Sequence, residues 1–341
     1  MNQVLQEKVE ALIREAGHIL LLTDERIDGD TTGSTLGFFH VLTDLGKRVE
    51  VFSPKPLPVM LEFLPGTNEI RRDETVFSQD SIDLVIICDC ADGEYLKKYL
   101  PLLPKRIPLV VFDHHQTNPG YGTVNIIEIE AASTSDIVWR FIKQAGYSVS
   151  AESAECILTG IYTDTDAFST ANTTANCLDA SAELVKLGAD PKTIIQHTMM
   201  NRSLASLKLW GIVLERLFHD SIFDATATVI TLKDLELTGA TEEDVSPISN
   251  FLNETLETKH EVVLVYSEKK DGCVKGSLRS RGRDVAVQAE RLYGGGGHKL
   301  AAGFKVVNAK LEKVGEKWAV VKTGISIFQS RDEPIKPFTR P

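Results

Sequence analysis

The chain has 341 residues, 43% of them hydrophobic and 25% charged, which is enough to build two globular domains of ordinary size. Its formal net charge of −11 argues against a broad basic surface that wraps long DNA or RNA, although a few arginines and bound metal ions could still hold a small polyanionic substrate. No apolar stretch is long enough to span a membrane, residues 1–22 lack signal-peptide features, and the five cysteines show no paired spacing, so we expect a cytoplasmic protein without membrane contacts, a disulfide framework or a zinc site.

In the first part of the chain, short apolar runs alternate with segments of helical periodicity. We predict strands at residues 19–22, 49–52, 84–88 and 109–112. We predict helices at residues 3–16, 31–45, 93–100, 134–144, 154–162, 175–187 and 191–199. Strands that alternate with helices are typical of an α/β domain with a mostly parallel sheet. A longer helix predicted at 203–219 is interpreted as a connector between two domains.

From Ile222 onward the pattern changes to that of a smaller α+β domain. We predict strands at 227–231, 262–266 and 274–278, and helices at 241–256 and 284–293. The segment from Arg331 to the end is polar and proline-rich, which favours a disordered tail.

Acidic or imidazole residues directly follow three of the predicted strands. Residues 24–30 follow the first strand, Asp89 follows the run at 84–88, and residues 113–115, Asp-His-His, follow the run at 109–112. A fourth acidic cluster, Thr-Asp-Thr-Asp at 163–166, ends a predicted helix. Because ligands bind beyond the carboxyl ends of parallel strands, we expect these groups to meet at one edge of the sheet.

Carboxylates that lie a few ångströms apart repel one another unless cations lie between them. Oxygen and imidazole ligands suit Mn²⁺ or Mg²⁺, and a pair of such ions can activate water and clamp a phosphate. Taken singly, Asp89 could be a helix cap and Asp28-Gly29-Asp30 a turn. Two adjacent imidazoles after an apolar strand have no such simple packing explanation. Together the groups predict a site for two divalent ions.

These residues resemble the DHH phosphoesterase superfamily, and within it the RecJ-like oligoribonucleases (nanoRNases) and phosphatases of 3′-phosphoadenosine 5′-phosphate. The resemblance covers about residues 10–306. Its motifs are DGDTTGS at 28–34, Asp89 after a strand, Asp-His-His at 113–115, Thr-Asp-Thr at 163–165 with Phe168 downstream, and GGGGHKLAAGF at 294–304. The resemblance implies a DHH domain with the metal site at 1–200, a connector helix at 201–220, a DHH-associated substrate-binding domain at 221–330 and a tail at 331–341.

The resemblance also implies roles for single residues. The implied metal ligands are Asp24, Asp28, Asp30, Asp89, His114 and Asp164. The implied substrate-binding residues are Ser277, Arg279, Gly295, Gly296, Gly297 and His298. The implied catalytic residues are Asp89, which bridges the two ions, and His115, which faces the scissile phosphate as hydrogen-bond donor or general acid. The basic run at 275–283 alternatively reads as a solvated strand edge, the commoner fate of a charge run.

Three positions depart from the family pattern. Asp24 replaces the usual histidine, Ile27 replaces a proline, and Asp166 replaces a glycine. Since the other implied ligands remain, we expect an active enzyme that cuts short RNA or dinucleotides to mononucleotides, with 3′-phosphoadenosine 5′-phosphate as a further substrate. We expect Mn²⁺ as the favoured ion, Mg²⁺ as the alternative, and a homodimer by family analogy. The alternative function is a weakened member that binds and senses nucleotides. A dinucleotide-cofactor enzyme or P-loop NTPase is disfavoured because neither glycine-rich motif is present.

Overall fold

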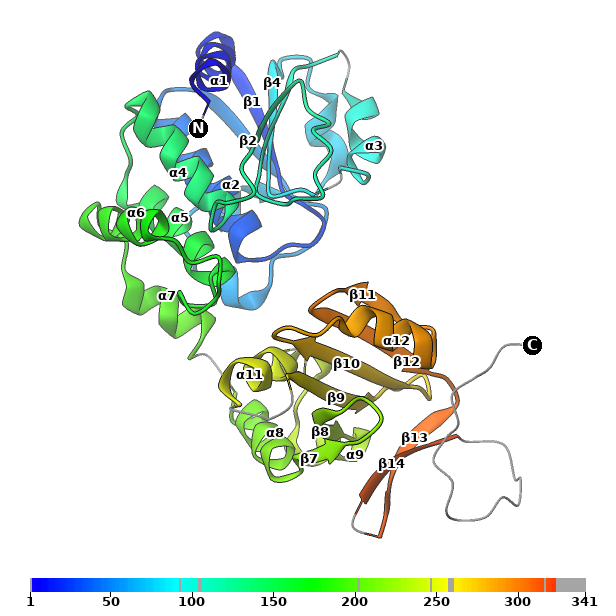
Figure 1. The fold of residues 1–341 in the computed structure, drawn as a ribbon. Coiled ribbons are helices and arrows are strands. Elements are labelled where there is room, and N and C mark those ends of the chain that lie inside the picture. Colours follow the sequence, from blue (N-terminus) through cyan, green and yellow to red (C-terminus); the bar gives the residue numbers. More distant parts are fainter. Residues whose placement is uncertain are drawn as a thin grey trace. The chain divides into compact units, whose positions relative to one another are not determined.

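The computed structural model describes residues 2–322, apart from positions 92, 104–105, 201–202, 246, 257–260 and 316. The chain divides into two compact units, Met1–Asn201 and Arg202–Pro341, which are described one at a time (Figure 1). Within the described ranges, no helix has the length and apolar character needed to cross a membrane. The predicted disordered tail from Arg331 lies outside the described residues.

The first unit is built on a six-stranded parallel sheet with the strand order β3-β2-β1-β4-β5-β6. The strands are β1 (His18–Leu22), β2 (Arg48–Phe52), β3 (Ile70–Arg71), β4 (Leu84–Cys88), β5 (Leu109–Asp113) and β6 (Val124–Ile127). All residues of β1, β4 and β5 are buried, which explains why each strand is a continuous apolar run rather than an alternating one. The sheet confirms the predicted α/β class, and the two unpredicted strands are the short ones at its edges.

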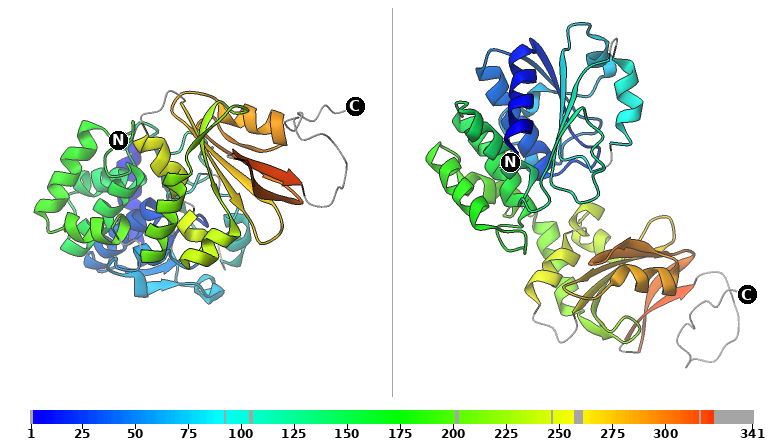
Figure 2. Two further views of the ribbon diagram at one scale, coloured as in Figure 1. Left: turned by 90° about the horizontal axis from the view of Figure 1, so that it is seen from below. Right: turned by 45° about the horizontal axis from the view of Figure 1, so that its top comes forward.

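Helices cover both faces of this sheet, because alternate residues of each strand point to opposite sides. The helices of the first unit are α1 (Gln3–Glu15), α2 (Gly29–Asp44), α3 (Leu96–Tyr99), α4 (Thr134–Ala145), α5 (Ala151–Asp164), α6 (Ala175–Lys186) and α7 (Pro191–Thr198). In the right-hand view of Figure 2, the blue and green helices lie on one side of the sheet and the cyan segment with α3 lies on the other. The helix predicted at 93–100 is reduced to the single turn α3, followed by a 3₁₀ turn at Leu100–Leu102 that contains a proline.

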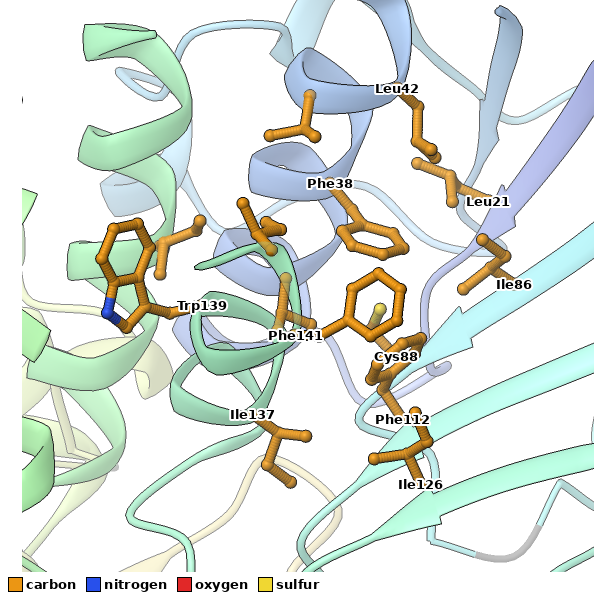
Figure 3. Packing of buried hydrophobic residues seen from close by; sticks show 14 of the residues in the cluster. Leu21, Phe38, Leu42, Ile86, Cys88, Phe112, Ile126, Ile137, Trp139 and Phe141 are labelled. Carbon is orange, nitrogen blue, oxygen red and sulfur yellow. The ribbon is translucent and has the colours of Figure 1, made fainter. Parts of the chain in front are cut away.

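The core beneath α2 and α4 is centred on three phenylalanines. Phe38 of α2, Phe112 of β5 and Phe141 of α4 are fully buried, and each pair of ring centroids is 5.3–5.6 Å apart in edge-to-face geometry (Figure 3). This packing fixes α2 and α4 against the sheet. Since the N-terminal ends of both helices carry or contact site residues, the core sets the geometry of the site.

Helices α2 and α5 lie in direct contact because glycines face the partner helix. A Cβ atom at Gly33 of α2 would lie 2.4 Å from the carbonyl oxygen of Cys156 in α5, and one at Gly160 of α5 would lie 2.9 Å from Oδ1 of Asp30 in α2. Real Cβ atoms do not approach other heavy atoms so closely. Gly33, in the motif at 28–34, is therefore required to bring the two helices together.

We expect the substitution Gly33→Ala to lower the free energy of unfolding by about 2–3 kcal/mol, because the helices must move apart to accept the methyl group. Gly211→Ala provides the control: Gly211 is exposed in helix α8 of the second unit, with nothing within 4 Å of an added Cβ. There the change should be neutral or stabilising by up to about 1 kcal/mol. Denaturant unfolding measures both effects, and equal stabilities of the two variants would refute the close contact.

The second unit contains a mixed six-stranded sheet with the order β11-β12-β10-β9-β8-β7, in which β8 and β9 are parallel and the other pairs antiparallel. Its strands are β7 (Phe218–Asp220), β8 (Ala225–Ile230), β9 (Val262–Glu268), β10 (Val274–Ser280), β11 (Gly296–His298) and β12 (Ala301–Val306). A separate hairpin joins β13 (Ala309–Val314) to β14 (Lys317–Lys322). This architecture confirms the predicted α+β domain.

The helices of the second unit differ from the prediction at two places. The helices are α8 (Leu204–Glu215), α9 (Leu232–Thr238), α10 (Glu242–Val245), α11 (Ile248–Thr255) and α12 (Val285–Tyr293). The helix predicted at 203–219 ends at Glu215, and its last residues form the edge strand β7 instead. The helix predicted at 241–256 is divided into α10 and α11, and Pro247 is the N-cap of α11. A proline inside a helix removes a backbone donor and clashes with the preceding turn, which accounts for the break.

Candidate functional site

The carboxyl ends of β1, β4 and β5 lie side by side in the first unit. Leu22 at the end of β1 pairs with Ile87 of β4, and Cys88 at the end of β4 pairs with Phe112 of β5. The strand order reverses between β1 and β4, so the chain leaves these two strands in opposite directions. In open α/β sheets such a switch point is where ligands bind. The sequence-predicted ligands are carried on the segments that follow these strands, and on α5.

The residues Asp28 and Asp30 begin helix α2. Asp28 is its N-cap, and its carboxylate accepts a hydrogen bond of 2.9 Å from the backbone N–H of Thr31. Asp30 is 1% exposed, and its two oxygens accept from the backbone N–H groups of Thr134 (2.6 Å) and Ser135 (2.8 Å) at the start of α4. Burial, and secondarily the carboxylate of Asp164, raises the pKa of Asp30 to about 8. The N-terminus of α4 thus holds this acid in one orientation.

The carboxylate of Asp89 lies between the ends of α2 and α4. Its Oδ2 accepts from Oγ1 of Thr31 at 2.7 Å, and its Oδ1 accepts from Oγ1 of Thr134 at 3.1 Å. The side chain is 5% exposed, and burial, followed by the charges of Asp30 and Asp28, raises the pKa of Asp89 well above its ordinary value. The backbone of Asp89 has a φ of +60°, a left-handed conformation that costs about 1 kcal/mol for a residue with a side chain.

The residues His114 and Asp164 complete the cluster. Nε2 of His114 lies 3.7 Å from Oδ1 of Asp89 and 3.7 Å from Oδ2 of Asp164, the last residue of α5. Burial lowers the pKa of His114, which favours the neutral imidazole that binds metal ions. Burial and the carboxylates of Asp89 and Asp28 raise the pKa of Asp164 to about 7. The acids disfavour one another's charge, as expected of a site that holds cations.

Two groups of ligand atoms meet the distance requirement for a bound metal ion. The first consists of Asp89, His114 and His115, and the second of Asp30, His114 and Asp164, with all ligand atoms of each group within 4.8 Å of one another. Asp28 belongs to neither group, although its charge raises the pKa of its acidic neighbours. Carboxylate oxygens and imidazole nitrogens are ligands that Mn²⁺ and Mg²⁺ accept. The residues present therefore fit a metal centre.

Asp24 does not join this cluster in the structure. Its carboxylate accepts from the backbone N–H groups of Glu25 and Arg26, and from the Arg26 guanidinium at 3.2 Å. It belongs to neither group of potential metal ligands.

Asp166, the other acid that departs from the family pattern, begins a run of three residues with φ of +44°, +59° and +64°, immediately after Asp164 and Thr165. Asn172 supports this loop by donating to the carbonyl oxygens of Ala132 and Asp164.

The imidazole of His115 is held from one side. Its Nδ1 lies 2.7 Å from Oδ1 of Asp113 and 3.6 Å from Oδ1 of Asp89, while the side chain is 42% exposed. The hydrogen bond with Asp113 is the main reason that the pKa of His115 is raised to about 9. Asp113 is wholly buried, which by itself would raise its pKa, but hydrogen bonds from His115 and Asn118 outweigh burial and lower it.

Sequence reasoning missed the side chains that support this site. No role was assigned to Thr31, Thr134, Asp113 or Asn118. Thr31 and Asp113 lie inside the motifs at 28–34 and 113–115, so the motifs carried a signal for these two residues. Thr134 has no such signal, because its contact with Asp89 depends on where α4 packs.

In the second unit, the predicted substrate-binding residues lie on β10 and β11, the two strands on either side of β12, except Gly295, which directly precedes β11. On β12, Gly303 pairs with Ser277 on one side and with Gly296 on the other. Two residues earlier on β12, Ala301 pairs with Arg279 on one side and with His298 on the other. The structure thus brings these residues of β10 and β11 to the same level of the sheet. Nε of Arg279 donates to Oδ1 of Asn250 on α11 at 2.6 Å, which orients the guanidinium.

The glycine run at 294–297 has several structural causes. Gly294 is the left-handed cap of α12, and a Cβ at Gly295 or Gly297 would lie 2.3 Å or 2.5 Å from a backbone oxygen of β12. Gly294 and Gly296 both have nothing within 4 Å of an added Cβ, but Gly294 needs its φ of +64° to end the helix, whereas Gly296 has no positive φ. Three of the four glycines are therefore explained by the tight pairing of β11 with β12 and the helix end, which leaves Gly296 as the position open to a ligand.

Comparisons with known proteins agree with both units. The model of the DHH family, N-terminal domain, matches residues 18–161, and that of the DHHA1 domain matches residues 228–322. The chain is 30% identical over 308 residues to a Thermus thermophilus protein named bifunctional oligoribonuclease and PAP phosphatase NrnA, and the matched region covers 90% of each chain. A Bacillus subtilis protein of the same name is 27% identical over 294 residues, or 84% of this chain and 89% of that protein. The crystal structure of an exopolyphosphatase-related protein from Bacteroides fragilis matches with a TM-score of 0.77 at 26% identity, covering 89% of this chain and 92% of that one.

Proposed function

Since this chain belongs to the DHH family of phosphoesterases, we propose that it is a metal-dependent hydrolase that cleaves short oligoribonucleotides or dinucleotides to mononucleotides. The observation that carries this proposal is the convergence of Asp30, Asp89, His114 and Asp164 at one sheet edge, with the pKa of each acid raised. Relatives named oligoribonuclease and PAP phosphatase support the substrate class.

Within the first unit, Asp28 and Asp89 would hold one divalent ion, and Asp30, Asp89, His114 and Asp164 the other. When bound, such ions supply an activated water and neutralise the charge that builds on the phosphoryl oxygens. Thr31 and Thr134 orient the shared carboxylate of Asp89 through their hydroxyl groups. We propose Mn²⁺ as the favoured ion, with Mg²⁺ as the alternative, because oxygen and imidazole ligands suit both.

His115 would act on the leaving oxygen. As water adds to phosphorus and the bond from phosphorus to the leaving oxygen breaks, Nε2 of His115 donates its proton to that oxygen. The hydrogen bond between Nδ1 and Asp113 leaves Nε2 free for this role. The imidazole then regains its proton from solvent before the next turnover.

In the second unit, Arg279, Ser277 and His298 would bind a phosphate or a terminal nucleotide, with Gly296 admitting the anion close to the backbone. Arginine grips phosphate through two parallel hydrogen bonds, and Asn250 already orients this guanidinium. A few such contacts suit a short substrate, and the net charge of −11 disfavours a long nucleic acid.

We propose 3′-phosphoadenosine 5′-phosphate as a further substrate, because the named relatives combine both activities in one protein. All five cysteines are buried and none is paired in a disulfide, which is compatible with the reducing environment of the cytoplasm that we propose for this protein. A homodimer is proposed by analogy with the family only. The second candidate function is a nucleotide sensor that binds without turnover, favoured by the place of Asp24 outside the cluster.

A substrate panel tests the proposed function. Di-, tri- and pentaribonucleotides, 3′-phosphoadenosine 5′-phosphate and a long RNA are incubated with the full chain in Mn²⁺, in Mg²⁺ and in excess chelator, and the products are separated by chromatography. We expect mononucleotides from the short substrates in the presence of metal and none with chelator, and no activity of an Asp89→Asn preparation, which excludes a contaminating nuclease. Tight binding of a dinucleotide without turnover under every metal condition would favour the sensor instead.

A further inference from the structure

Asn118 connects the ends of two neighbouring strands to the side chain that holds His115. Its Nδ2 donates to Oδ2 of Asp113 at 2.5 Å and to the carbonyl oxygen of Cys90 at 3.0 Å. Its Oδ1 accepts from the backbone N–H of Gly120 at 2.9 Å. Since both amide hydrogens and the amide oxygen have partners, the orientation of this side chain is fixed. Cys90 directly follows Asp89, so Asn118 contacts the segments after both β4 and β5.

The two oxygens of Asp113 have different partners. Oδ1 accepts from Nδ1 of His115 at 2.7 Å and from the backbone N–H groups of His114 (2.8 Å) and His115 (3.1 Å), whereas Oδ2 accepts from Asn118. The carboxylate is 0% exposed, so water cannot replace a lost donor without a local rearrangement. The rotation of this carboxylate, and with it the direction of its bond to His115, therefore depends on Asn118.

We propose that Asn118 is a positioning residue, which acts through Asp113 to hold the imidazole of His115 in place, with its Nε2 directed at the leaving oxygen. The inference rests on the proposed function, because it assigns a device to the proton transfer by His115. Asn118 touches neither substrate nor metal ligand in this arrangement, and its effect is confined to the orientation of the imidazole. In metal sites, removal of a hydrogen-bond partner that orients another side chain without touching the metal lowers activity by about 10- to 100-fold.

The alternative is that Asn118 only stabilises the loop after β5, and a change of leaving group separates the two roles. Hydrolysis of a diribonucleotide expels a nucleoside alkoxide, a poor leaving group that needs a proton, whereas hydrolysis of the p-nitrophenyl ester of thymidine 5′-monophosphate expels p-nitrophenolate, which needs none. Loss of proton donation therefore slows the first substrate much more than the second. Damage to the loop slows both substrates alike.

The experiment compares steady-state kinetics of Asn118→Ala with those of the parent chain on the two substrates. We expect kcat on the diribonucleotide to fall about 10- to 100-fold with KM little changed, and kcat on the nitrophenyl ester to fall by less than about 3-fold. Asn118→Asp is a second variant in case alanine prevents folding: it keeps the acceptor for Gly120 but removes the donor to Asp113, and the same split is expected. Combining Asn118→Ala with His115→Gln should add no further loss beyond that of His115→Gln alone.

Tyr121→Phe is the matched control. The hydroxyl of Tyr121 donates a hydrogen bond of 2.9 Å to the same carbonyl oxygen of Cys90 and makes no hydrogen bond to Asp113 among the described contacts. We expect its kinetics to match the parent on both substrates. Equal losses on both substrates for the Asn118 variants, or no loss on either while the parent is active, would overturn this inference alone. Absence of turnover by the parent chain on either substrate would overturn the proposed function, and this inference with it.

Discussion

Replacing Asp89 with asparagine is expected to lower kcat by about 1000-fold or more, well beyond the 10- to 100-fold typical of residues that only support a metal ligand. Asp89 is the carboxylate that both proposed ion sites share, and it accepts hydrogen bonds from Thr31 and Thr134. Asparagine keeps the shape of the side chain and tolerates the left-handed backbone at this position, so loss of fold does not confuse the result.

The same substitution should raise the melting temperature of the metal-free protein. Burial and neighbouring acids raise the pKa of Asp89, which means that its charged form is disfavoured in the folded chain. A neutral amide removes that unfavourable charge. Calorimetry in chelator measures the effect, and Asp44→Asn, an exposed acid in the last turn of α2, serves as the charge-matched control with unchanged activity. An active Asp89→Asn enzyme would contradict the shared-ligand role.

His115→Gln is expected to lower kcat about 100- to 10,000-fold, the usual range for the loss of a general acid. Binding of at least one ion should persist, because the group formed by Asp30, His114 and Asp164 does not include His115. Steady-state kinetics on a diribonucleotide and Mn²⁺ titration of the same sample measure the two properties separately. His197→Gln, a histidine of α7 that stacks on Phe63 away from these contacts, should keep parental kinetics. Parental kcat in His115→Gln would exclude proton donation by this residue.

The central strands of the first unit could be predicted because they are buried on both faces. Strands β1, β4 and β5 contain continuous apolar runs of four or five residues, which is typical of strands in a buried parallel sheet. The edge strands β3 and β6 gave no such signal, since they are shorter and only partly buried. In the second unit, β11 is three exposed residues rich in glycine, and it is a strand only because β12 lies beside it.

In the candidate site, the ligands could be predicted from local sequence motifs, whereas their hydrogen-bond partners, which lie far away in the chain, could not. Asp30, Asp89, His114 and Asp164 could be proposed from the sequence, because each follows a strand or ends a helix and belongs to a recognisable motif. Their hydrogen-bond partners could not, because Thr134 meets Asp89 across 45 positions of the chain and Asp30 meets Ser135 across 105. Those contacts depend on the packing of α2 and α4, which the core around Phe38 and Phe141 determines.

The positive φ of Asp89 and the place of Asp24 were also beyond sequence reasoning. A left-handed aspartate after a buried strand has no local signature, and it persists because the surrounding hydrogen bonds and strand pairing hold it. The resemblance implies Asp24 as a ligand because the family carries a histidine at this position. In the structure, Arg26 and two backbone N–H groups are its partners instead.

Titration of Mn²⁺ into the metal-free full chain, followed by calorimetry, tests most directly whether the clustered acids form a metal centre. The arrangement of Asp30, Asp89, His114 and Asp164 predicts saturable binding of two ions per chain, a higher melting temperature on binding, and loss of at least one ion in Asp89→Asn. Absence of saturable binding of either Mn²⁺ or Mg²⁺, with Asp89→Asn indistinguishable from the parent, would contradict it.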